Sequence, residues 1–390
     1  MKDYYDKKKR LLESLTAKNL LQDKRLYQAF MEVPLEEFIP RKYIDTVKLY
    51  KDIPNLFYYQ DPQNYRTISA PHMITIMLQG LALKKDDDLL ILGAKSGYIS
   101  ALAHKLAPKG EIIILEANSE IATITRENLE KLDLDKNVSV IVKNPLEGMP
   151  DLSPWQKILV TGAIRQNRIH PLLKQLDPNE GVLYAPIGEE LVQTYTQILR
   201  VDGNFYGKRQ LKVRFTPLMT RVELDNIQLA ADVEESGKPI EIKHNPEKVD
   251  EALEDIKVKY ASNIIDEIDM EEQPKTKELE LKLREEAIQF LRELLDHARC
   301  FKTEDEISTC FDLIEYMDGE IESLKTFKKD LGLKVKKIKS IVNNIRSYNI
   351  LRKDLDKSDN MEKKHEIINK QMNEINTLEE LIHSEIERLQ

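Results

Sequence analysis

The chain has 390 residues, of which 41% are hydrophobic and 33% are charged, and its formal net charge is −9. This length suffices for two or three domains, and the negative balance argues against binding of nucleic acid by phosphate neutralisation. The two cysteines, Cys300 and Cys310, have no cysteine–histidine cluster beside them, so we expect no disulfide framework, no metal site and a cytoplasmic location. No stretch approaches the roughly 20 apolar residues that a membrane-spanning helix needs, so we expect no membrane contact.

Residues 1–222 have the pattern of an α/β domain, because short apolar runs alternate with helical periodicity and turn signals. The first element is predicted to be a helix over Leu11–Glu32. Buried parallel strands are predicted at Leu89–Leu92, Ile112–Leu115, Val138–Val142 and Ile158–Thr161, and further strands at Val182–Pro186, Tyr195–Val201 and Leu211–Phe215. The series predicts a doubly wound, mostly parallel, Rossmann-like sheet that binds ligands at the carboxyl ends of its strands.

Residues 223–274 are predicted to connect this domain to a helical extension. A short strand is expected near Ile240–Ile242, and Asn245 followed by Pro246 is typical of a helix start. We expect the first domain to end near residue 222, with its sheet complete.

Residues 275–390 contain no proline and only two glycines, Gly319 and Gly332, which favours long helices. One apolar stripe begins at Leu283, and a second begins at Ile307 and runs to Leu324 or onward to Ile345. A capping box is predicted at Thr303–Glu306, and a polar break at Lys357–Asn360. The pattern favours an antiparallel coiled coil or helical hairpin. Two alternatives stay open: the helices pack on themselves or a second copy, or they dock a protein partner.

The predicted strand ends carry residues suited to a nucleoside-bearing cofactor. Gly93 and Gly97 bracket a tight turn after the first buried strand, where missing side chains let the backbone approach a ligand. Glu116 ends the second strand, about where a carboxylate binds ribose hydroxyls in nucleotide-binding α/β folds. Asn144 follows the third strand and offers an amide to an adenine edge. Because no phosphate-binding GKS/T loop occurs, S-adenosylmethionine is a better candidate than ATP.

The segment Thr67–Met73 (TISAPHM) resembles the signature of protein-L-isoaspartate (D-aspartate) O-methyltransferases. Further segments resemble motifs of that family in the same order, namely Val33–Pro40, Tyr50–Pro54, Gly93–Tyr98, Asn144–Pro150, Pro171–Leu176, Ala185–Gly188 and Phe215–Leu218. The resemblance covers about residues 10–220.

This resemblance implies a class I S-adenosylmethionine-dependent methyltransferase. Such an enzyme transfers a methyl group to the carboxylate of an isoaspartyl residue in a damaged protein or peptide, and the ester then collapses to a succinimide, which allows repair. By match to the motifs, Ser69 is predicted to orient the acceptor as the catalytic residue. The residues predicted to bind the cofactor are Thr67, Ile68, Gly93, Lys95, Ser96, Gly97, Glu116 and Asn144.

The departures from the family pattern cluster in the cofactor site. Lys95 stands at the middle glycine of the loop, Ile91 at a usual acid, Asn144 at a usual aspartate and Arg66 at a usually small residue. One alternative is therefore a catalytically weak or inactive relative that serves as a partner-binding module through its helical extension. Another alternative is a methyltransferase that acts on a different substrate, which could be RNA. The basic stretch Lys328–Lys339 is the observation that supports this alternative.

Overall fold

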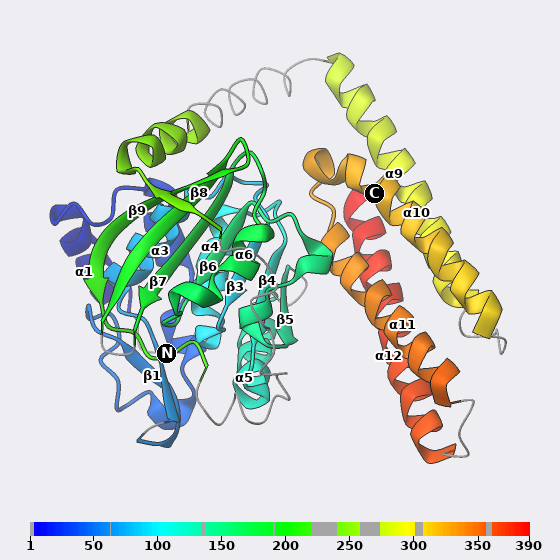
Figure 1. Cartoon of the computed structure of the whole chain (residues 1–390), viewed down its shortest axis with the longest axis horizontal. Coiled ribbons are helices and arrows are strands. Elements are labelled where there is room, and N and C mark those ends of the chain that lie inside the picture. The colour runs from blue at the N-terminus through cyan, green and yellow to red at the C-terminus, as the bar shows by residue number, and fades with distance from the viewer. Residues whose placement is uncertain are drawn as a thin grey trace. The chain divides into compact units, whose positions relative to one another are not determined.

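The computed structural model describes residues 4–62, 64–134, 137–189, 192–219, 240–257, 274–300, 307–355 and 361–390. It divides into two compact units, Met1–Ala261 and Ser262–Gln390. The first unit holds the main sheet, and long helices make up the described part of the second (Figure 1). Within the described ranges, no helix is both long and apolar enough to cross a membrane.

The main sheet is doubly wound and mostly parallel, as predicted. Its strand order is β10-β9-β8-β7-β6-β3-β4-β5, and only β8 runs antiparallel to its neighbours. The strands are β3 (Leu89–Leu92), β4 (Ile112–Glu116), β5 (Val138–Val142), β6 (Lys157–Val160), β7 (Gly181–Gly188), β8 (Gln193–Val201), β9 (Asn204–Val213) and β10 (Ile242–His244). The chain proceeds from β3 outward to β5 and then returns to β6 on the other side of β3. The carboxyl end of β3 is therefore the switch point at which such sheets bind ligands.

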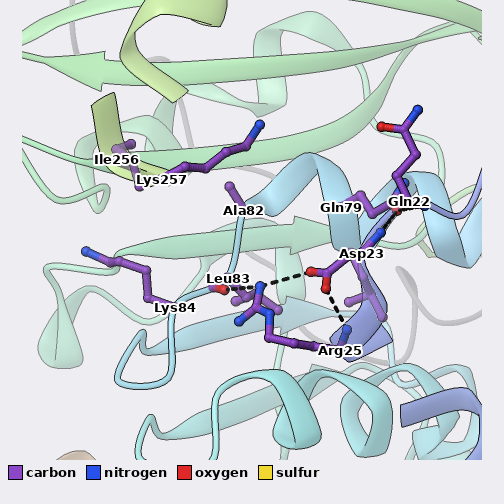
Figure 2. Close-up of a pocket in the computed structure, with 10 residues that line it drawn as sticks. Gln22, Asp23, Arg25, Gln79, Ala82, Leu83, Lys84, Ile256 and Lys257 are labelled. Carbon is purple, nitrogen blue, oxygen red and sulfur yellow. Dashed lines mark hydrogen bonds and ion pairs between the residues drawn. The ribbon is translucent and has the colours of Figure 1, made fainter. Parts of the chain in front are cut away.

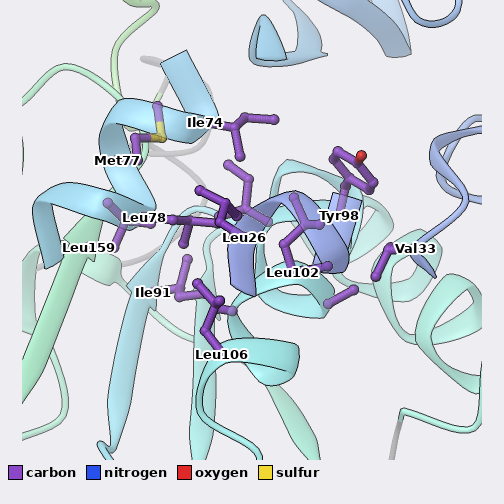
Figure 3. Packing of buried hydrophobic residues seen from close by; sticks show 14 of the residues in the cluster. Leu26, Val33, Ile74, Met77, Leu78, Ile91, Tyr98, Leu102, Leu106 and Leu159 are labelled. Atoms are coloured by element: carbon purple, nitrogen blue, oxygen red, sulfur yellow. The ribbon is translucent and has the colours of Figure 1, made fainter. Parts of the chain in front are cut away.

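Alternate strand residues point to opposite faces of this sheet, and both sets are apolar. Helices therefore cover both faces. Ile91 and Leu159 pack with Leu26, Leu78 and Leu102 on one face (Figure 3). These side chains come from α2 (Lys24–Glu32), α3 (Pro71–Leu81) and α4 (Tyr98–Leu106), and α1 (Tyr5–Ala17) and α5 (Ser119–Glu130) contribute to the same core.

The opposite face has its own core, in which Leu90 and Leu92 of β3 pack with Trp155 and with Leu172 of α6 (His170–Lys174). The nearly continuous apolar runs in β3, β4 and β6 follow from this double coverage. Short 3-10 turns connect the elements: η1 (Leu35–Phe38), η2 (Arg41–Tyr43), η3 (Lys95–Gly97), η4 (Pro145–Glu147), η5 (Pro150–Leu152) and η6 (Gln166–Arg168).

Two parts of the N-terminal region differ from the prediction. The single helix expected over Leu11–Glu32 is wrong, since α1 ends at Ala17 and α2 starts at Lys24. Asn19 adopts a left-handed φ of 56°, and the Asp23 side chain caps α2 by accepting the Arg25 N–H at 2.8 Å. The sequence analysis also missed a hairpin of β1 (Asn55–Asp61) and β2 (Asn64–Ile68), which leads directly into the Thr67–Met73 segment.

Residues 240–257 belong to the first unit. β10 pairs in parallel with β9, with Ile242 opposite Phe205. A helix over 246–257 follows, and Asn245 caps it by accepting the Lys248 N–H at 2.9 Å. Val249 of this helix is fully buried in the core that also holds Leu199. The sheet and its core thus extend past the boundary expected at residue 222.

The second unit contains α9 (Pro274–Cys300), α10 (Ile307–Leu331), α11 (Val335–Leu355) and α12 (Met361–Leu389). α9 contacts α10, α10 contacts α11, α11 contacts α12, and α12 contacts α9, so the described helices enclose one core (Figure 1). The apolar stripe that starts at Ile307 does not continue to Ile345 in one helix. Gly332 ends α10, since it has a φ of 62° and its N–H donates to the Lys328 carbonyl at 2.8 Å. The predicted capping box at Thr303–Glu306 and the polar break at Lys357–Asn360 lie outside the described residues.

A candidate cofactor cleft at the carboxyl ends of the strands

The loop after β3 needs glycine at both of its ends. Gly93 has a φ of 92°, and a Cβ atom there would lie 2.5 Å from Thr161 Oγ1. Gly97 has a φ of 91°, where other residues are strained. The Thr161 hydroxyl lies 2.9 Å from the carbonyl oxygens of both Leu92 and Gly93 and donates to them. The loop is thereby attached to the end of β6.

Between the two glycines, Lys95 and Ser96 also have left-handed backbones, with φ of 45° and 59°. Each such non-glycine residue costs roughly 1–2 kcal/mol, so surrounding contacts must impose this conformation. One is the Ser96 carbonyl, which accepts a hydrogen bond from Asn128 Nδ2 at 3.1 Å. The Ser96 hydroxyl is fully buried and has no hydrogen-bond partner among the described residues.

Glu116 connects this loop to β4. Its Oε2 accepts the Ala94 N–H at 2.9 Å, and its Oε1 accepts the Asn118 N–H at 3.1 Å. These bonds use two of about four acceptor positions that a carboxylate offers. The residue is buried, so its charge lies in a region poorly screened by water.

A cavity of only about 20 Å³ lies beside Glu116. Its walls come from the β1–β2 hairpin, the β3 loop, the ends of β4 and β6, and the segment after β9. They comprise Phe57, Arg66, Gly93, Ala94, Lys95, Glu116, Ile121, Thr161, Gly162, Thr216, Pro217 and Leu218.

Lys95 is the unusual member of this wall. Its side chain is 9% exposed, and no hydrogen bond or ion pair within 4 Å holds its ammonium group among the described residues. Burial, reinforced by the positive charge of Arg66, lowers the pKa of Lys95 to about 8, and Glu116 acts in the opposite direction. The lysine is therefore mostly charged at neutral pH, in a place that disfavours its charge.

The other residues predicted to form the site are not among those that line the cavity. Thr67 and Ile68 are on β2, and Ser69 is buried between β2 and the start of α3. Asn144 follows β5 and caps η4: its Oδ1 accepts the Leu146 N–H at 3.0 Å, and its Nδ2 donates to Glu147 at 3.0 Å. The structure thus brings Gly93, Lys95 and Glu116 into one wall, and the proposed roles of the rest stay predictions.

Sequence reasoning did not nominate Phe57, Thr161 or Leu218, although all three line the cavity. Thr161 was the last residue of a predicted strand, so its place at the ligand-binding edge could have been inferred. Gly162 follows it, and the structure shows why a side chain is absent there: a Cβ would lie 2.6 Å from the Leu218 backbone. Phe57 could not be predicted as a lining residue, because the hairpin that carries it was not predicted.

A larger hollow, of about 320 Å³, lies elsewhere in the first unit (Figure 2). Its polar wall is internally paired: Gln79 Oε1 accepts the N–H groups of Gln22 and Asp23, and Arg25 donates to Asp23 and to the Leu83 carbonyl. Leu83 and Lys84 precede β3, so this hollow lies toward the amino end of that strand. It is therefore separate from the cleft formed by the strand ends.

The doubly wound sheet, the glycine loop after β3 and the carboxylate ending β4 define a class I S-adenosylmethionine-dependent methyltransferase. Residues 6–223 match the family model of protein-L-isoaspartate(D-aspartate) O-methyltransferase. This match spans more than half of the chain, and the chain belongs to that family.

Curated relatives agree with this assignment. A protein-L-isoaspartate O-methyltransferase of Ignicoccus hospitalis is 32% identical over 219 residues, which are 55% of this chain and 98% of the relative. A relative from Pyrococcus horikoshii is 32% identical, with 56% of this chain and 95% of the relative covered. A solved structure of a protein-L-isoaspartate O-methyltransferase is 26% identical and aligns with 54% of this chain and 65% of its own, at a TM-score of 0.47.

The residue types in the cleft fit S-adenosylmethionine, but the cavity in this structure is smaller than the cofactor. Glu116 supplies a buried carboxylate, the type of acceptor that ribose hydroxyls require, and the two glycines leave the loop backbone without side chains. Sites for molecules of this size usually enclose about 300–1,000 Å³, far above the cavity present. No described residue holds the Lys95 ammonium by a hydrogen bond or ion pair, so this side chain can shift when a ligand enters, but only within the length of its stem because its backbone is held.

Proposed function

We propose that the protein is an S-adenosylmethionine-dependent carboxyl methyltransferase that acts on L-isoaspartyl residues of damaged proteins and peptides. The observation that carries this proposal is the family match over residues 6–223, in a chain that keeps the glycine loop and its bond to Glu116. The substrate is assigned through the family and its curated relatives.

The chain has little covalent chemistry to perform. When bound, S-adenosylmethionine supplies a methyl carbon that its sulfonium already activates. An isoaspartyl carboxyl group is ionised at neutral pH, so no general base is needed. The residues around the cleft must align a carboxylate oxygen and exclude water. Ser69, buried between β2 and α3, is proposed to orient that carboxylate by donating its hydroxyl hydrogen.

A second candidate function is favoured by one specific observation, namely that Lys95 and Arg66 occupy the wall of a cleft of about 20 Å³. A relative with this obstruction would be weakly active or inactive and would act through its helices. Calorimetric titration of the full chain with S-adenosylhomocysteine separates the two candidates. Saturable binding at one site supports the enzyme, and heats equal to buffer dilution at millimolar ligand would refute it.

The helical unit is proposed to recruit a protein partner or a second copy of the chain, and the protein is proposed to be cytoplasmic. The bundle encloses its own core, yet Leu281, Tyr316, Ile350 and Leu351 are exposed on it, which supports an association surface. Sedimentation equilibrium over a range of concentrations tests self-association. A monomer throughout would leave a different protein as the partner.

A further inference from the structure

We infer that Lys95 makes the cofactor cleft selective for charge, so that the neutral thioether S-adenosylhomocysteine is favoured over the cationic sulfonium S-adenosylmethionine. This inference rests on the proposed function, because it assigns a specificity-determining residue to the same cleft. It concerns this chain in particular, since Lys95 stands at a position where the resemblance leads us to expect glycine.

Among the residues that the structure describes, more positive than negative side chains line the cavity. Arg66 approaches from β2, Lys95 from the β3 loop and Glu116 from the end of β4. The other side chains in the wall, such as Phe57, Ile121 and Leu218, do not titrate. Two cations therefore face one carboxylate whose oxygens already accept the Ala94 and Asn118 N–H groups. A sulfonium would add a third positive charge to this buried group.

Lys95 cannot withdraw far when a ligand enters. The backbone on either side is fixed, since Ala94 donates to Glu116 and Ser96 accepts from Asn128. The Lys95 backbone is itself held in the left-handed region. The ammonium group can therefore move only within roughly 6 Å, the length of its four-carbon stem. If the ammonium group stays within this range of a bound sulfonium, the two positive charges repel each other strongly, because little water screens them.

Steric obstruction and charge can be separated by comparing the two ligands. They differ in one methyl group and one positive charge, so the bulk of Lys95 affects both alike. The ratio of their dissociation constants isolates the charge effect. If Lys95 instead binds the carboxylate that both ligands carry, both affinities change together and the ratio stays constant.

The experiment measures the dissociation constants of both ligands by calorimetry on the full chain. Lys95→Met keeps the bulk and removes the charge, Lys95→Arg keeps the charge, and Lys24→Met removes the same charge from the exposed start of α2. We expect Lys95→Met to lower the ratio of S-adenosylmethionine to S-adenosylhomocysteine dissociation constants by about three- to tenfold, and both other variants to leave it within twofold. Raising the pH from 7 to 9 should lower the ratio in the unmodified chain more than in Lys95→Met, since the pKa of Lys95 is about 8.

An unchanged ratio in Lys95→Met, with both ligands bound, would overturn the inference and leave the methyltransferase assignment intact. An unmodified chain that binds neither ligand would overturn both. Circular dichroism melting curves confirm that each variant is folded, and Lys95→Gln provides a second neutral variant if Lys95→Met is not.

Discussion

Oε2 of Glu116 accepts a hydrogen bond from the backbone N–H of Ala94 at 2.9 Å, and this contact joins the ends of two neighbouring parallel strands. It places the one carboxylate found among the described lining residues of the cavity against the glycine loop. The same carboxylate therefore holds the loop and lines the cavity proposed to bind the cofactor, so we expect changes at Glu116 to affect both.

Glu116→Ala should weaken S-adenosylhomocysteine binding by more than about tenfold, because it strands ribose hydroxyls and the Ala94 N–H in a poorly hydrated cleft. Calorimetry measures the affinity. Glu127→Ala, an exposed acid on α5, is the matched control and should bind as the unmodified chain does. Equal affinities for the two variants would exclude Glu116 as a cofactor ligand.

Lys95 should make the stability of the first unit depend on pH. Its pKa in the folded chain, about 8, lies below the 10.5 of an exposed lysine, so the unfolded chain binds more protons between these values. Stability from this group therefore rises as the pH increases from about 8 to 10.5. Lys95→Met should be more stable than the unmodified chain at pH 7, and urea unfolding should show this advantage shrinking toward pH 10. A pH-independent difference would contradict the buried, charged state of Lys95.

Ser69→Ala should lower the rate of methyl transfer by about a hundred- to a thousandfold, the cost of removing one aligned hydrogen-bond donor from an active site. Its affinity for S-adenosylhomocysteine should remain within twofold, since Ser69 lies outside the cavity wall. Single-turnover assays and calorimetry measure the two quantities. The exposed Ser14→Ala on α1 is the control. If affinity falls and the rate constant does not, Ser69 is a cofactor contact.

The first unit should need residues beyond 222 for full stability. A fragment of residues 1–257 retains β10 and the buried Val249, whereas a fragment of 1–222 loses both. We expect the shorter fragment to be less stable by about 2–4 kcal/mol, since it exposes the edge of β9 and a hollow in the core. Urea unfolding of both fragments tests this. Equal stabilities would restore the domain boundary at residue 222.

The sequence predicted the inner strands of the main sheet well because each is a short apolar run between turn signals, whereas the strand predicted at Leu211–Phe215 is β9, over Asn204–Val213. β3 and β5 have the predicted bounds, and β4 extends one residue further, to Glu116. Single side-chain interactions were harder to predict. The Asp23 cap divides an otherwise continuous helical pattern, and Gly332 ends α10 within a continuous apolar stripe.

The cofactor cleft shows the same contrast. Gly93 and Glu116 could be predicted because glycine and charge at strand ends are local signals, and Lys95 because the loop around it resembles the family motif. The wall formed by Phe57 and Leu218 depends on how distant segments pack, which no local pattern encodes. Lys95 and Arg66 likewise line the same cavity from two different elements, and the positive charge of Arg66 lowers the pKa of Lys95.

The central claim, carboxyl methylation of isoaspartyl residues, is tested most directly by incubating the full chain with methyl-labelled S-adenosylmethionine and a pair of peptides. The peptides share one sequence and differ only in an isoaspartyl or an aspartyl residue. We predict base-labile methyl ester on the isoaspartyl peptide alone. Label on neither peptide, from a chain that binds S-adenosylhomocysteine, would contradict the claim.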